Sequence, residues 1–169
     1  MKKVLSTLVL LLVPVMMMGE SFTVLWKKVA EAQQKDLPKT EISILNTIIA
    51  KATTEDNYGH LIKAQLAKYH ACRLFNDEEV AATVEEIKQK EAQTKSKALR
   101  AVYDCALGLI CQDLAQSNEE TDTLSQLYFR KSMSDPDELA RHKTTELQPA
   151  FISGLDSRIF NNDLLHVVG

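Results

Sequence analysis

Apolar residues recur every three or four positions from Glu20 to about Phe129, which is the spacing of amphipathic helices. No segment alternates apolar and polar residues at the two-residue period of a strand. Beyond Glu20 the chain holds only three prolines, Pro38, Pro136 and Pro149, so helices can run long between them. The pattern therefore predicts an all-α protein.

The first half of the chain predicts three amphipathic helices. The first covers residues 22–35 and ends at the break 36–38. The second begins at Pro38, because a proline in the first turn of a helix needs no hydrogen-bond acceptor, and the third covers about 58–75. The predicted buried positions are Phe22, Leu25, Trp26 and Val29, then Ile42, Leu45, Ile48, Ile49 and Ala52, then Leu61, Ile62, Leu66 and Tyr69.

The second half predicts three further helices. A charged helix capped by Asn76 or Asp77 ends at 94–96, and helices at about 97–115 and 120–133 follow. Apolar residues cover more than half the circumference of the helix at 97–115, so we expect it to lie at the centre. The predicted buried positions are Val80, Val84 and Ile87, then Leu99, Val102, Tyr103, Ala106, Leu107, Leu109, Ile110 and Leu114, then Leu124, Leu127, Tyr128 and Phe129.

Helices of this length joined by short turns fold back on one another as antiparallel helical hairpins. Successive hairpins begin near Phe22, Tyr58 and Lys97, a period of about 36 to 39 residues that suits a tetratricopeptide-like stack. The side-chain signature of that repeat is not present, so a short tetratricopeptide-like solenoid and an irregular bundle are both compatible with the pattern. We expect one helical-hairpin domain at residues 20–147.

The C-terminal part of the chain changes character. A cap, a proline and two acids at 134–138 predict a short helix start. Later, an Asn-Asn-Asp cap at 161–163 precedes an apolar turn at 164–168, and an isolated turn is unfavourable to nucleate. We therefore expect 148–169 to be an extended segment followed by the start of a truncated helix.

The N-terminus predicts a secretory signal peptide. Lys2 and Lys3 precede an apolar run at 5–13, and Gly19 precedes the first acidic residue. This run is shorter than the roughly 20 residues that a membrane-spanning helix needs. We expect a signal peptide at 1–19 and an exported, periplasmic or extracellular protein with no permanent membrane anchor.

The charge balance argues against nucleic acid as a partner. The net charge of −3 becomes −5 once Lys2 and Lys3 leave with the signal peptide. Lysine and arginine alternate with acids along every segment, whereas binding nucleic acid requires a basic stripe that neutralises phosphates.

The three cysteines, Cys72, Cys105 and Cys111, lie in apolar stretches where cysteine behaves as a small buried hydrophobe. The alternative is one disulfide between Cys72 and either of the other two, because Cys105 and Cys111 point to different sides of one helix. Since no cysteine precedes Cys72, no lipid-attachment site follows the signal peptide.

The four histidines, His60, His70, His142 and His166, lack the spacing of a zinc site. A cysteine nucleophile would need a histidine base, and Cys72 with His60 or His142 is the arrangement that the sequence allows. The chain has no glycine-rich phosphate loop and no nucleophile elbow. We therefore expect no catalytic residue, no metal site and no cofactor.

Two surface features have a structural reading beside a functional one. The acidic pairs suit solvated helix faces with nearby lysines better than calcium or acid-base sites; they are Glu78-Glu79, Glu85-Glu86 and Glu119-Glu120. The stripe of Phe22, Trp26 and Val29 could dock a partner, but we expect it to pack on the next helix.

Three stretches closely resemble the N-terminal region of bacterial alpha-2-macroglobulin family proteins. They are LWKKVAEAQQKDLPKTEISILNTIIAKATTEDNYGHLIKAQL at 25–66, LRAVYDCALG at 99–108 and SGLDSRIFNNDLLHVVG at 153–169. The resemblance implies a leading helical region ahead of β-sandwich domains in a large secreted protein of the peptidase-trap type.

The resemblance carries no activity onto a residue of this chain. The family's thioester needs a cysteine and a glutamine in a set spacing that Cys111-Gln112-Asp113-Leu114 lacks, and the bait region is not part of this stretch. The resemblance therefore implies a non-catalytic structural or interaction domain, with downstream macroglobulin-type domains or another envelope protein as partner. The alternative is a free-standing exported helical-repeat adaptor that binds peptides or proteins.

Overall fold

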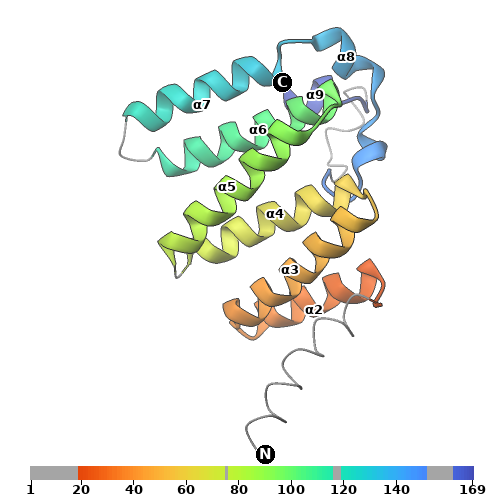
Figure 1. The fold of residues 1–169 in the computed structure, drawn as a ribbon, viewed down its shortest axis with the longest axis vertical. Coiled ribbons are helices and arrows are strands. Elements are labelled where there is room, and N and C mark those ends of the chain that lie inside the picture. Colours follow the sequence, from red (N-terminus) through yellow and green to blue (C-terminus); the bar gives the residue numbers. More distant parts are fainter. Residues whose placement is uncertain (1–18, 75, 116–118, 152–161) are drawn as a thin grey trace, which may run out of the picture. The chain divides into compact units, whose positions relative to one another are not determined.

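The computed structural model describes residues 19–74, 76–115, 119–151 and 162–169 (Figure 1). Within these ranges the regular structure is helical, with no strand and one isolated antiparallel bridge between Lys143 and Asp163. The all-α prediction is confirmed. Most of the predicted signal peptide lies outside the described residues.

Chain contacts divide the protein into two compact units, residues 1–76 and 77–169. The sequence pattern predicts one hairpin domain at 20–147, and the division falls at the predicted turn between the third and fourth helices.

The first unit contains three helices, and α3 packs against both α2 and α4. Ser21 caps α2 and Asn57 caps α4 through their side-chain oxygens, while Pro38 opens α3. These starts agree with the predicted ones. The helices are α2 (Phe22–Gln34), α3 (Pro38–Thr54) and α4 (Tyr58–Arg73).

Both turns of the first unit use an aspartate in the left-handed region. Asp36 has a φ of 52° and Asp56 a φ of 50°. Aspartate tolerates this conformation better than most residues. The turn lets the N–H of the next residue donate a hydrogen bond to the carbonyl five residues before it, which closes the preceding helix. The two bonds run from Leu37 N to Ala32 O, at 3.0 Å, and from Asn57 N to Ala52 O, at 2.9 Å.

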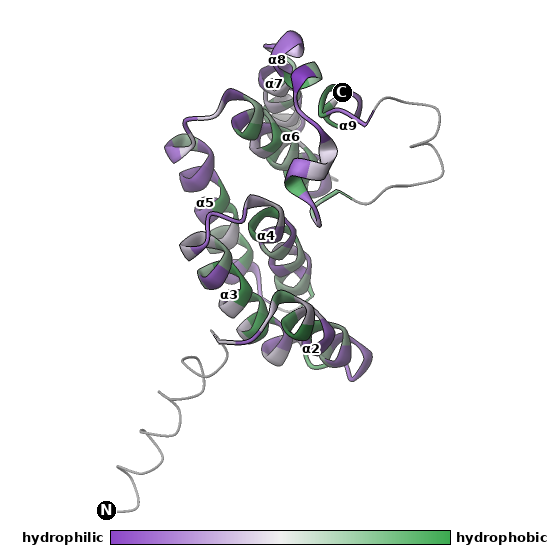
Figure 2. Cartoon of the chain, turned by 90° about the vertical axis from the view of Figure 1, so that its right-hand side faces the viewer, coloured by the Kyte–Doolittle hydropathy of each residue, from purple (hydrophilic) through white to green (hydrophobic). Residues whose placement is uncertain are grey.

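The second unit is arranged around α6, which packs against α5, α7, α8 and α9. The central position predicted for this helix is confirmed within its unit. Figure 2 shows the amphipathic pattern as alternating hydrophobic and hydrophilic segments along the helices. The elements are α5 (Asp77–Gln93), α6 (Lys97–Leu114), α7 (Glu119–Ser132), α8 (Pro136–Arg141), the 3-10 helix η1 (Thr144–Leu147) and α9 (Leu165–Val168).

The predicted inward face of α7 is wrong in part. Leu124 and Leu127 are 36% and 47% exposed, whereas Ser125 is buried and donates to the carbonyl of Gly108 at 3.0 Å. A Cβ at Gly108 would lie 2.7 Å from a ring carbon of Phe129, so the missing side chain lets α7 come close. Close approach through small residues turns the larger leucines outward.

Other predicted core positions also differ from the structure. Leu109 is 53% exposed because it lies on the side of α6 away from its neighbours. Ile49, Leu66, Val84 and Leu114 are only half-buried. Helical periodicity marks an apolar stripe but does not tell which part of a wide stripe a neighbour covers.

The C-terminal turn α9 is held by tertiary contacts. Leu164 and Val168 are buried, and α9 packs on α6 and α8. Asp163 accepts a hydrogen bond from the backbone of His166 at 3.1 Å, which gives it the capping role expected of the 161–163 segment. Packing therefore supports a turn that would not persist alone. The extended segment expected after Leu147 falls mostly outside the described residues.

Candidate functional site

A cleft of about 350 Å³ opens in the second unit between the start of α6, the end of α7 and α8. This volume is near the lower end of the range for ligand pockets. Ionisable side chains of both signs line it. They are the basic Lys97, Arg100 and Lys131 and the acidic Asp104, Asp135 and Glu138.

The helical repeat of α6 places the first wall of the cleft. Arg100 and Ala101 lie three and four residues after Lys97, and Asp104 lies four and three residues after them, so the four share one face. Ser96 fixes the start of this face, because its Oγ accepts from the backbone N–H of Leu99 at 3.2 Å. The wall thus begins at a capped helix end and runs inward to Asp104.

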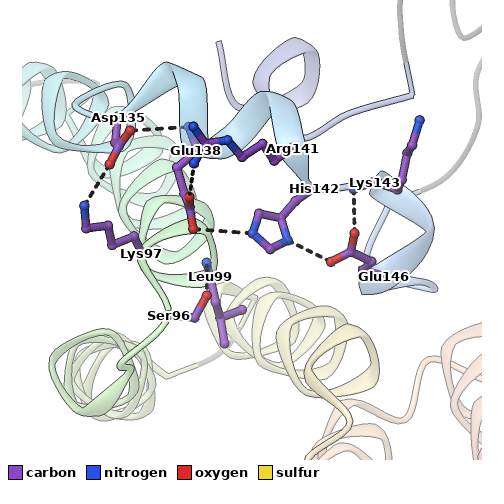
Figure 3. Close-up of polar contacts among 9 residues, drawn as sticks. All are labelled: Ser96, Lys97, Leu99, Asp135, Glu138, Arg141, His142, Lys143 and Glu146. Carbon is purple, nitrogen blue, oxygen red and sulfur yellow. Dashed lines mark hydrogen bonds and ion pairs between the residues drawn. The ribbon is translucent and has the colours of Figure 1, made fainter.

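A chain of polar contacts holds α8 against α6 (Figure 3). The ammonium of Lys97 lies 3.0 Å from Oδ2 of Asp135, whose Oδ1 caps α8 by accepting from the backbone of Glu138 at 3.3 Å. Glu138 contacts Arg141 at 3.3 Å and Nε2 of His142 at 3.5 Å. The rim is therefore tied together before any ligand is bound.

The same chain continues into η1. Nδ1 of His142 lies 2.9 Å from Oε2 of Glu146, and Oε1 of Glu146 accepts from the backbone of Lys143 at 2.8 Å (Figure 3). The hydrogen bond to Glu146 is the main cause that raises the pKa of His142, and the neighbouring Glu138 adds to it. His142 is thus a rim residue that links two carboxylates.

Asp104 is the unusual residue of the cleft. The residue is only 4% exposed, and its Oδ1 has no hydrogen-bond partner among the described residues. Burial, followed by the carboxylate of Glu91, raises the pKa of Asp104 to about 6, although Lys131 and Arg100 act in the opposite direction. A buried carboxylate without its hydrogen bonds destabilises a fold. The cleft therefore contains an acceptor that lacks a donor.

The cations nearest to Asp104 are engaged elsewhere. The guanidinium of Arg100 lies 3.7 Å from Glu91 and donates to the carbonyl of Thr94. The ammonium of Lys131 lies 5.2 Å from the centroid of the Tyr128 ring. Neither interaction supplies the donor that Oδ1 of Asp104 lacks. The arrangement can accept a hydrogen-bond donor, and a cationic donor most strongly.

The histidines are placed separately. His60 belongs to the first unit, His70 is exposed, His142 lies on the cleft rim, and Nδ1 of His166 lies 2.7 Å from Asp163. Across the ranges that the structure describes, no group of three or more His, Cys, Asp or Glu residues could hold a metal ion.

The N-terminal aromatic stripe packs within the first unit. Leu25 and Val29 are buried, and half-buried Trp26 donates from Nε1 to Nδ1 of His60 at 2.8 Å. Phe22 stacks on the same imidazole with ring centroids 3.8 Å apart. Packing within the protein is confirmed, but Phe22 and Trp26 contact His60 on α4 rather than the next helix in sequence, α3.

The cysteines are thiols in the structure. Cys72 and Cys111 are buried, as expected of small hydrophobes, and Cys105 is half-buried with its Sγ 3.7 Å from the carbonyl of Val168. Burial raises the pKa of Cys105 and of Cys111. A raised pKa disfavours the thiolate that nucleophilic catalysis requires.

The acidic pairs lie mainly at the surface. Glu78, Glu85 and Glu86 are exposed and Glu79 is half-buried, while the side chains of Glu119 and Glu120 fall outside the description. Solvated helix faces account for the described pairs, as expected.

Sequence reasoning missed Asp104. The available signal was an acid in the middle of the most apolar helix, between Tyr103 and Cys105, which periodicity places on a face that packing covers. A charge at such a position requires a partner or a function.

Of the helices that the structure describes, none is both long and apolar enough to cross a membrane. Compared with family models, curated proteins and solved structures, the chain has no match.

Proposed function

We propose that the chain is a non-catalytic helical interaction domain that binds a segment of a partner polypeptide in the cleft beside Asp104. The observation that carries this proposal is the buried Asp104 carboxylate, whose Oδ1 has no donor within the described part of the chain. A residue that breaks a local rule of stability is expected at a functional site rather than in an inert core. A bound segment would supply the missing donor.

The form of the cleft suits an extended peptide. Its rim is fixed by the contact between Lys97 and Asp135, and it presents charges of both signs to an incoming chain. A volume of about 350 Å³ accommodates a side chain or two rather than a folded domain. Recognition in such a site rests on a few anchoring side chains.

The resemblance to macroglobulin N-terminal regions gives this domain a wider setting. We place it at the front of an exported macroglobulin-type polypeptide, with signal peptide 1–19, and with the downstream domains or another envelope protein as partner. In this setting the domain contributes binding and packing, and the trapping of peptidases belongs to other parts of the polypeptide. A free-standing exported adaptor with the same cleft is the competing assignment.

Site-specific photo-crosslinking in the source organism tests the proposal. A photoreactive residue replaces Ser134, which lines the cleft, and a matched variant carries it at Ala92, an exposed position on α5 outside the cleft lining. We expect position 134 to give a discrete crosslink to one polypeptide segment and position 92 to give none. Equal crosslinking at both positions, or none at 134, would contradict binding in the cleft.

The identity of the crosslinked segment separates the two assignments. A segment from macroglobulin-type sequence, in the same polypeptide or in a second one, supports the first. A segment from an unrelated exported protein, together with a gene that ends after Gly169, supports the adaptor.

A further inference from the structure

We propose that the cleft recognises a lysine followed by an acidic residue, with the lysine ammonium donating to the Asp104 carboxylate and the acidic side chain pairing with Lys131. This inference rests on the proposed function, since it names the chemistry of the segment that the cleft would bind.

The requirement for a cation follows from Asp104. Asp104 is 4% exposed as a residue, and within the described residues its Oδ1 receives no hydrogen bond. An ionised acceptor binds a charged donor roughly twice as strongly as a neutral one. Leu139, Ala98 and Ala101 also line the cleft, so part of the wall that the methylenes of a lysine would meet is apolar.

An ammonium suits this acceptor better than a guanidinium. Arginine binds best where two acceptor oxygens face its planar fork, whereas lysine acts as a compact point charge. The orphan atom at Asp104 is the single Oδ1, which offers one acceptor rather than two. A guanidinium would therefore meet an acceptor that does not match its planar geometry.

The acidic neighbour follows from Lys131. Its side chain is exposed at the cleft, and its ammonium contacts the Tyr128 ring rather than a carboxylate among the described residues. Lys97 and Arg100 are paired with Asp135 and Glu91, so Lys131 is the lining cation that is left for a ligand carboxylate. The six charged lining residues balance, which matches a ligand segment with no net charge.

Peptide titration by NMR on the full-length chain tests the inference. The probes are acetyl-Gly-Lys-Glu-Gly-amide, the same peptide with Gln for Lys, the same peptide with Gln for Glu, and n-butylamine as a free ammonium. We expect the first peptide to bind, replacement of Lys to weaken binding at least 10-fold, and replacement of Glu to weaken it several-fold. The titration midpoint of the Asp104 carboxyl should fall when the first peptide is bound.

Variants of the chain locate the effect. Asp104→Asn should weaken binding of the Lys-Glu peptide at least 10-fold and leave binding of the Gln-Glu peptide unchanged. Asp113→Asn, on the same helix but outside the cleft lining, should bind both peptides like the parent chain. Circular dichroism verifies that both variants are folded.

The outcomes separate the two proposals. If the Gln-Glu peptide binds as tightly as the Lys-Glu peptide, lysine recognition is wrong while peptide binding in the cleft stands. If n-butylamine binds and no peptide does, the cleft is a small-amine site, which overturns this inference and the proposed function together. Failure of the Lys-Glu peptide to bind at millimolar concentration overturns the inference.

Discussion

The indole nitrogen of Trp26 on α2 donates a hydrogen bond to Nδ1 of His60 on α4, across 2.8 Å. An imidazole nitrogen that accepts a hydrogen bond carries no proton, so the neutral His60 holds its proton on Nε2. The ring of Phe22 stacks on the His60 imidazole with an interplanar angle of 9°. The ammonium of Lys63 lies 4.5 Å from the centroid of the Trp26 ring. Phe22, Trp26 and Lys63 thus surround His60 in its neutral state.

This relationship predicts that the first unit loses stability in mild acid. Burial, followed by the charge of Lys63, lowers the pKa of His60 from its ordinary value of 6.5. As the pH falls below 6.5, the unfolded chain takes up the proton first, and the contribution of neutral His60 is lost on the way down to the folded pKa. Trp26 is the single tryptophan, so its fluorescence during urea unfolding at pH 7.5 and 5.5 reports on this unit.

The matched controls use the same helix. His60→Gln should reduce this acid sensitivity, whereas His70→Gln, at an exposed position, should retain it. An unchanged pH dependence in His60→Gln would assign the effect to another group.

The second unit contains a histidine with the opposite behaviour. The hydrogen bond to Glu146 raises the pKa of His142 above its ordinary value of 6.5. Charged His142 therefore stabilises the junction of α8 and η1 fully below 6.5, and this contribution is lost as the pH rises through the folded pKa. Because the pair is near the surface, the effect is at most about 1 kcal/mol. The rate of amide hydrogen exchange around residue 142 should rise with pH more steeply than the intrinsic exchange rate of an unstructured chain.

His142→Gln removes the charge while keeping a polar side chain at the position. The pH-dependent part of the protection should then disappear, and protection in the first unit should not change. Equal loss of protection in both units would point to a global effect instead.

Removing the charge of Asp104 should stabilise the fold at neutral pH. The pKa of Asp104 rises from 3.8 to about 6 on folding, so the folded chain binds the proton more tightly, and the ionised form destabilises it above pH 6. We expect Asp104→Asn to raise the free energy of unfolding at pH 7.5. This effect should exceed the effect of the same substitution at pH 4 by about 2 to 3 kcal/mol. Urea unfolding of both chains at these two pH values measures the difference.

Asp113→Asn serves again as the control, because it lies on α6 outside the cleft lining. The same gain in both variants would mean that net charge, rather than the cleft, is responsible. A gain in stability combined with lost peptide binding is the signature of a residue retained for function.

The contact between α6 and α7 depends on Gly108. A Cβ at this position would lie 2.7 Å from a ring carbon of Phe129, so Gly108→Ala forces the ring to move. Alanine gains up to about 1 kcal/mol of helix propensity, but overpacking costs about 1 to 3 kcal/mol. We expect a net loss of about 1 kcal/mol in thermal or urea unfolding. The double variant Gly108→Ala with Phe129→Leu should recover most of it, and a stabilised single variant would contradict the close contact.

The sequence by itself determined the helices of the protein. The starts at Phe22, Pro38, Tyr58 and Lys97 follow from local signals, namely caps, a proline and apolar periodicity, and all four are where the structure has them. Such signals act within one or two turns, so they do not depend on what the rest of the chain does. The hairpin arrangement followed from short connections between long helices.

Only the tertiary structure decided which faces those helices cover. Periodicity predicted Leu124 and Leu127 to be inside, yet α7 meets α6 through Ser125, because Gly108 leaves room there and the leucines are turned outward. The burial of Asp104 was also decided by tertiary packing, since neighbouring helices cover its side of α6 and form the cleft there. Burial and the contacts it enforces are properties of several segments at once, and no single segment specifies them.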